Sequence, residues 1–245
     1  MTTAHGTDGW TAAVRQRLAL GRLLPLGEAA DGTWLAERAA RAELRRAADG
    51  VRGVVLADGL RIGAAGPGAD GEPVVPLPPS ALPPGPLRID GRFTAVSPPV
   101  GSAAPAESLP ALAERLREAL SAGARERLGL VVTEIDLRVT ALVTEAPAEP
   151  AEPVAPHEGQ AVSPQDDVER AVAAVPGVAY LTGALGGPVV TAPGQVRVEL
   201  ATAAGHHPVA VAREVRAGLA RSLPGAPSVA VLITAVEATV ADRVS

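Results

Sequence analysis

A helix followed by a strand, at residues 108–144, constrains the fold of this chain more than any other stretch. Ser108 can cap the helix, and Pro110 lies in its first turn, where a missing N–H costs little. Leucines then recur at helical spacing up to Leu120, which predicts one apolar helix face. After Gly129 the pattern changes to strict alternation of apolar and polar residues, typical of a half-buried strand.

A weaker copy of this helix and strand returns at residues 208–238, so the chain has the pattern of a tandem repeat. Matching landmarks keep their order, and the offset between them falls only in loops. The offset is 124 between Gly53 and Gly177, 109 between 87–89 and 196–198, and 94 between Thr140 and Thr234. We therefore predict an α+β protein of two related small α/β-sandwich units, each in the order α-β-β-α-β with its helices on one face of a small sheet.

The remaining patterns set the expected boundaries. We expect an N-terminal amphipathic helix at 1–20, a first unit at 21–144 with a Pro-rich insertion at 64–86, a disordered Pro/Glu-rich linker at 145–164, and a second unit at 165–245. Within the first unit, the segment after Gly21 predicts an edge strand, and residues 34–48 predict a helix that begins at Trp34. The insertion is expected to be a semi-rigid surface loop, or else a ligand for a proline-binding module.

Composition excludes several classes of function. The net charge of −5 argues against nucleic acid or an anionic membrane as the default partner. The absence of cysteine excludes disulfides, thiolate metal sites and thiol nucleophiles. No apolar run reaches the length of a membrane span, and no signal pattern opens the chain, so a soluble cytoplasmic protein is expected.

The residues that could carry chemistry have simpler structural explanations. His206 and His207 resemble the start of a metal site, but no carboxylate stands at ligand spacing, and a solvated loop is the better interpretation. Glu134 and Asp136 share a strand face with Arg138, as on any solvated surface. The glycine-rich residues 183–188 lack a phosphate-loop motif. We assign no catalytic, cofactor-binding or metal-binding residue.

The last strand of the second unit is the predicted contact surface. In the first copy, the outward positions of the corresponding strand are polar, namely Glu134, Asp136, Arg138 and Thr140. In the second copy the matching face is largely apolar, and the candidate contact residues are Ala230, Leu232, Thr234 and Val236. An apolar sheet face of this size should not stay in water, so we expect it to pack against the N-terminal unit, a partner protein or a second copy of the chain.

The second half resembles the alkaline-shock-protein (Gls-type) envelope stress response family. The matching pieces are Gly177-Val178, the strand at 196–200, the helix at 211–219 with Val215-Arg216, and the closing strand at 229–236. The resemblance implies a small, non-enzymatic α+β protein without cofactors that self-associates and is linked to the cell envelope through a membrane-anchored partner. The doubling of the unit and the Pro-rich insertion depart from the family pattern, as does the complete absence of lysine. The chain as a whole resembles the tandem members found in GC-rich bacteria.

The sequence thus predicts a cytoplasmic scaffold or adaptor of the envelope stress response type that acts through protein–protein contacts. The alternative is a nucleic-acid-binding α+β module, for which the arginine-rich helix at 38–46 is the candidate surface. An enzyme with an unrecognised pocket is the remaining alternative.

Overall fold

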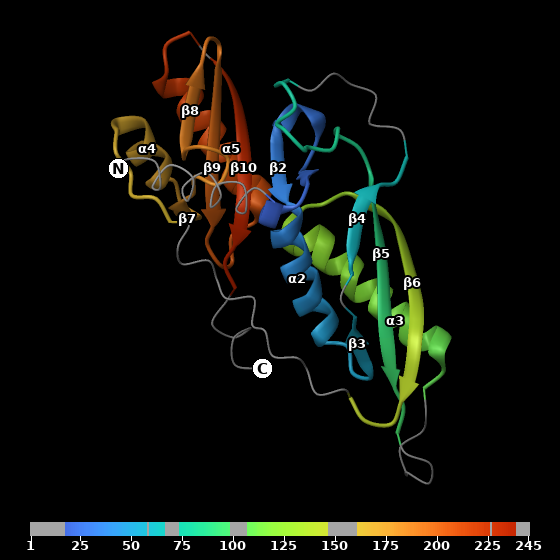
Figure 1. The fold of residues 1–245 in the computed structure, drawn as a ribbon. Helices are drawn as coiled ribbons and strands as arrows, with labels where there is room; N and C mark the ends of the chain where they lie inside the picture. The colour runs from blue at the N-terminus through green and yellow to red at the C-terminus, as the bar shows by residue number, and fades with distance from the viewer. Residues whose placement is uncertain are drawn as a thin grey trace, which may run out of the picture.

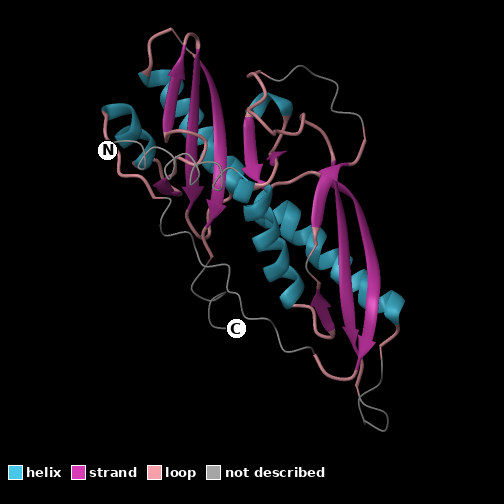
Figure 2. Cartoon of the chain, in the orientation of Figure 1, coloured by secondary structure: helices cyan, strands magenta, loops and turns pink. Residues whose placement is uncertain are grey.

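The protein folds into two β-sheets that lie side by side, each with helices against it (Figures 1 and 2). The computed structural model describes residues 18–57, 59–66, 74–98, 107–146, 161–225 and 227–238. Helices and strands are mixed along the chain, so the predicted α+β class is confirmed. Of the N-terminal helix predicted for 1–20, only residues 18–20 are described, and they are helical.

The strands are β1 (Leu23–Pro25), β2 (Thr33–Ala36), β3 (Val54–Leu56), β4 (Arg61–Ala64), β5 (Leu87–Val96), β6 (Val132–Val143), β7 (Val178–Leu181), β8 (Val189–Ala192), β9 (Gln195–Thr202) and β10 (Ser228–Val236). The helices are α2 (Glu37–Asp49), α3 (Leu109–Ala122), α4 (Asp167–Ala173) and α5 (Pro208–Ser222), with a 3-10 turn η1 (Ala29–Asp31) and a π-helical turn η2 (Gly123–Leu128) that continues α3.

The four-stranded sheet is centred on β5. On one side β5 pairs in parallel with β6, and on the other it pairs antiparallel with β3 and β4, which lie end to end. The alternation of β5 is complete, since every second residue from Leu87 to Ala95 is buried and the residues between them are not. Ser108 caps α3 as predicted, accepting a hydrogen bond from the Ala111 N–H at 3.3 Å.

The six-stranded sheet combines strands from both ends of the chain. Its order is β1-β2-β10-β9-β7, with β8 also paired to β9. β9 and β10 are parallel, and β2 joins the far side of β10 in parallel, with Leu232 opposite Trp34. The boundary predicted at residue 21 is therefore wrong for this segment, because β1 and β2 extend the sheet of the C-terminal half rather than the sheet of 54–143.

The helix predicted for 34–48 begins later than expected, at Glu37. Trp34 and Leu35 belong to β2, whose four residues are all buried. Burial of every residue in a row is typical of a short strand covered on both faces, whereas an amphipathic helix buries only one stripe. The backbone turns into α2 after Ala36, which is still extended (φ −61°, ψ 131°).

The two segments predicted to be loops or linkers take part in the fold where they are described. Val162, inside the linker predicted for 145–164, forms a bridge with Leu181 through its N–H at 2.8 Å. Residues 147–160 of this linker lie outside the described residues. In the Pro-rich insertion Val75 is 3% exposed, and Leu82 donates its N–H to the Leu23 carbonyl at 2.8 Å. The insertion therefore packs against the rest of the structure at Val75 and Leu82, while Leu77 between them is 44% exposed.

Candidate interaction surfaces

The predicted contact residues lie inside the protein. β10 runs between β9 and β2, and β2 occupies its outer edge at residues 231–233. Leu232 is fully buried, Thr234 is 4% exposed, Ala230 is 8% exposed, and only Val236 at the strand end is half-buried. Ala230, Leu232 and Thr234 are therefore not accessible to a partner chain in this structure, and a contact surface has to lie elsewhere.

Two segments from different parts of the chain cover this face of β10. The Pro-rich insertion approaches Ala230 and Arg197 across a cavity of about 190 Å³. It is fastened at Trp34, whose indole N–H donates to the Leu82 carbonyl at 3.2 Å. Near the other end, the Thr182 and Thr234 hydroxyls share a 2.8 Å hydrogen bond. The apolar outer face predicted from the sequence is thus explained by cover from within the chain.

A buried carboxylate joins the N-terminal hairpin to the C-terminal half. Asp31, in the turn between β1 and β2, accepts two hydrogen bonds from Arg213 of α5, at 2.7 Å from Nε and 2.8 Å from Nη2. Arg216, one turn further along α5, donates to the Ala30 carbonyl at 2.8 Å and to the Asp31 carbonyl. The hydrogen bonds from Arg213 hold the pKa of the Asp31 carboxyl below its usual value. No sequence motif marks these residues as partners, because they lie at opposite ends of the chain.

One of the two adjacent histidines contributes to the packing of the two halves. His207 is the residue that precedes α5, and its Nε2 lies 3.5 Å from the Arg125 carbonyl of η2. Within the described ranges, no group of three or more histidine and acidic side chains is placed to hold a metal ion. Glu43 of α2 is likewise buried for a structural reason, since it pairs with Arg46 and, at 2.9 Å, with Arg127.

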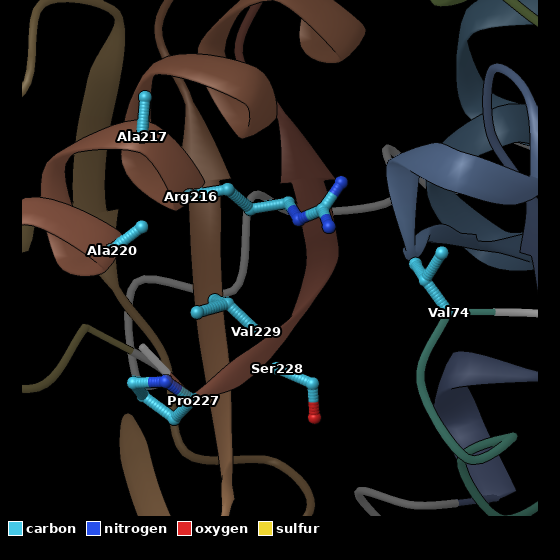
Figure 3. A pocket seen from close by; sticks show the side chains of 7 residues that line it. All are labelled: Val74, Arg216, Ala217, Ala220, Pro227, Ser228 and Val229. Carbon is cyan, nitrogen blue, oxygen red and sulfur yellow. The ribbon is translucent and has the colours of Figure 1, made fainter. Parts of the chain in front are cut away.

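A cavity of about 340 Å³ lies between the C-terminal half of α5 and the start of β10 (Figure 3). Alanines of α5, Ala217 and Ala220, form one wall, and Val74 of the Pro-rich insertion stands across from them. Arg216 is the one charged side chain in the lining, and its guanidinium is already bound to the Ala30 carbonyl. The lining therefore offers apolar packing and no convergent set of acids or bases.

The outer face of the four-stranded sheet carries charges that are separated along the strand. At one end Arg88 is surrounded by carboxylates, Asp90 at 2.9 Å, Asp136 at 2.7 Å and Glu134 at 3.9 Å, and their proximity raises its pKa. Further along, Arg92 and Arg138 are opposite each other. No ion pair is found for either of these two arginines among the residues that the structure describes. One end of this face thus has excess negative charge, and the other has excess positive charge.

β6 is the border of this sheet and pairs only with β5 among the described strands (Figure 1). The residues near its two ends include large apolar side chains in water, with Val131 52% and Leu142 61% exposed. Between them Ile135, Leu137 and Val139 point to the helix side but remain half-buried. Arg117 of α3 reaches the strand from that side, its Nε 3.4 Å from the Ile135 carbonyl. Sequence analysis predicted the solvated outer face of β6 correctly and missed that the strand is an edge.

No family model, curated protein or solved structure matches the chain. The resemblance drawn from the sequence therefore stays a prediction. None of the helices in the described residues has the length and hydrophobicity that a bilayer-spanning segment needs.

Proposed function

We propose that this protein is a non-enzymatic adaptor that binds a protein chain along the open edge of β6. The observation that carries the proposal is a difference between two corresponding strands, β10 and β6: one has a strand on its outer edge, and the other has none among the described strands. In the six-stranded sheet, the strand after α5 pairs on its outer edge with β2, over residues 231–233. In the four-stranded sheet, the strand after α3 pairs only with β5 in the described structure. An added strand satisfies the free N–H and C=O groups of such an edge, which is a recurring mode of protein recognition.

We further propose that the two halves are related copies, as the sequence offsets predicted. The strand topology supports this relation, because each half has two short antiparallel strands on one side of a long strand and a parallel strand on the other. The irregularities also match. The ladder of β5 and β6 skips Thr140, and the ladder of β9 and β10 skips Thr234. Each threonine hydroxyl donates to a carbonyl of the neighbouring strand, at 3.1 Å and 3.3 Å respectively.

If the halves are copies, the strand registers favour a different alignment of one segment. The sequence comparison matched 87–89 with 196–198, but Arg88 lies opposite Glu134 while Gln195 lies opposite Ser228. Glu134 and Ser228 are equivalent by the offset of 94, so Arg88 corresponds to Gln195 rather than to Arg197. A shift of two residues leaves every side chain on the same face of the strand, which explains why alternation alone could not detect it.

The resemblance to the alkaline-shock-protein family supplies the wider setting of the proposal. In that setting the adaptor is cytoplasmic, and its partner is a membrane-anchored protein of the envelope stress response. Nucleic acid is a weaker candidate, because Arg88 is neutralised by three carboxylates on the outer face of the four-stranded sheet.

Crosslinking in the source cells tests the adaptor role. The test variant places lysines at Val131 and Leu142, both exposed near the ends of β6. The matched control places lysines at Val74 and Val190, which are also exposed apolar residues but belong to the segment beside β10 and to β8 of the other sheet. We expect the test variant to lose specific crosslinked proteins that the wild type and the control retain. Recovery of the same proteins with all three chains contradicts the proposal.

A further inference from the structure

We infer that the occupant of the β6 edge is a second copy of this chain, paired antiparallel about a twofold axis at Leu137, so that the two four-stranded sheets become one continuous sheet. This inference rests on the proposed function and specifies its partner. It starts from the charge separation along β6, because a surface with one negative end and one positive end is complementary to itself when reversed.

The charges on β6 itself show the separation. Glu134 and Asp136 occupy the first outward positions, and Arg138 occupies the next. On β5, Arg88 is the single cation among the carboxylates at the negative end, and Arg92 adds to the positive end. A parallel copy would place like charges opposite each other along the whole strand. An antiparallel copy brings the acidic end against the basic end.

The pleat and the charges together select one register. A twofold axis perpendicular to the sheet keeps the helix-facing side chains on one face, so the axis must pass through a residue pair rather than between pairs. An axis at Asp136 would place two aspartates opposite each other, and an axis at Arg138 would place two arginines opposite each other. An axis at Leu137 places Asp136 opposite Arg138 of the second copy, twice, and no like charges directly opposite.

The apolar side of the strand agrees with the same register. It places Leu137 against its own equivalent and Ile135 against Val139 of the second copy. Each of these side chains is half-buried in the single chain and would lose its remaining contact with water. The register also brings the exposed Leu142 beside Val132 at each end. The ladder irregularities at Thr133 and Thr140 fall outside the stretch from Ile135 to Val139, which is symmetric about Leu137, so they do not interrupt its pairing.

Arg117 is the side chain that an incoming strand would displace from the edge of β6. Its Nε lies 3.4 Å from the Ile135 carbonyl, on the edge that a second copy would use. This contact is long for a hydrogen bond, and the Arg117 guanidinium also pairs with Glu114 on the same helix. A main-chain N–H from the incoming strand would replace it without leaving the arginine uncompensated.

Charge reversals measured by sedimentation velocity on the full chain test the inference. Asp136→Arg alone and Arg138→Asp alone each put two like-charge pairs across the twofold axis, and we expect each to raise the dimer dissociation constant at least about tenfold. The double variant D136R/R138D restores both pairs and should return the constant to near the wild-type value. Arg221→Asp, an exposed reversal on α5, is the control and should leave it unchanged. Urea unfolding of each variant shows whether a loss of assembly is merely a loss of folding.

The outcomes separate this inference from the adaptor role. Failure of the double variant to recover, or a wild-type chain that stays monomeric across the micromolar range, overturns the self-pairing. If a monomeric wild type nevertheless loses its crosslinked proteins on lysine substitution at Val131 and Leu142, the adaptor role stands with a different occupant. If neither assembly nor crosslinking responds to any change on β6, both fail.

Discussion

Replacement of Asp31 by asparagine should loosen the attachment of the N-terminal hairpin to the C-terminal half. The carboxylate accepts from Arg213 at 2.7 and 2.8 Å and from the Glu28 N–H at 2.8 Å, and the residue is 7% exposed. Asparagine keeps an acceptor for the Glu28 N–H, but it cannot accept both donors of the guanidinium and carries no charge to neutralise it.

The size of the effect follows from the unequal burial of the two partners. Breaking a fully buried ion pair costs about 3–5 kcal/mol, and breaking an exposed one costs about 0–1 kcal/mol. The Asp31 side chain is 10% exposed, whereas that of Arg213 is 56% exposed and can be rehydrated once it is released. We therefore expect Asp31→Asn to lower the free energy of unfolding by about 2 kcal/mol at neutral pH.

Urea unfolding followed by tryptophan fluorescence measures this loss. Trp34 lies in β2 next to the perturbed turn and is 1% exposed, so it reports undocking of the hairpin directly. A Trp10→Phe background makes Trp34 the single tryptophan. Asp90→Asn is the matched control, because the Asp90 side chain is 49% exposed and its partner Arg88 keeps Asp136. The control should change stability by less than about 0.5 kcal/mol.

The pH dependence gives the refuting result. The pKa of Asp31 is lower in the folded protein than in the unfolded chain, so its contribution is present above the unfolded value of about 3.9 and is lost as the pH falls through the folded value. The stability gap between wild type and Asp31→Asn should therefore be full at pH 7 and should close in acid. A gap no larger than that of the control at pH 7, or one that stays constant through the acid range, would refute the reasoning.

Three further outcomes are expected. Gly129→Ala should destabilise the protein in urea by more than about 2 kcal/mol, because Gly129 has φ +80° and a Cβ there would lie 2.6 Å from an imidazole; Gly205→Ala, with φ +77° and open space, should cost only about 1 kcal/mol. Tyr180, the single tyrosine, should titrate by ultraviolet absorbance with a pKa of about 12, raised first by burial and then by Glu237. Its contribution to stability is therefore present below about pH 10 and is lost as the pH rises through 12. In Glu237→Gln this contribution should be smaller. Leu232→Ala should lower the free energy of unfolding in urea by about 3 kcal/mol, since the side chain is fully buried; a loss below about 1 kcal/mol would contradict its burial.

The elements that were predictable from the sequence are those with a sustained period. The helix capped by Ser108 and the alternating strand β6 repeat their pattern over many residues, and both formed where expected. β2 did not, because its four residues are too few to show a period. Trp34 and Leu35 fit a helix face as well as a strand. They form a strand because they pair with β10, about two hundred residues later in the chain.

The candidate surface was misplaced for a similar reason. Alternation identifies which residues of a strand share a face, but it does not identify what lies on that face or whether the edge is paired. β6 and β10 both read as half-buried closing strands. Only the non-local ladders separate them, since β10 has a neighbour on each side and β6 has one among the described strands. The Asp31–Arg213 pair was invisible in the same way, because nothing in either local pattern requires an opposite charge at the other end of the chain.

Two asymmetries between the halves nevertheless belong together. The first half has a Pro-rich insertion, and the second half has an apolar outer strand face where the first is charged. The structure brings these features into contact, with Val75 and its neighbours lying over Ala230. The apolar face in one half and the extra segment in the other therefore compensate each other. In the half whose outer face is charged, Glu134, Asp136 and Arg138 are exposed to water. In the proposed pairing, these charges determine the orientation of the incoming strand.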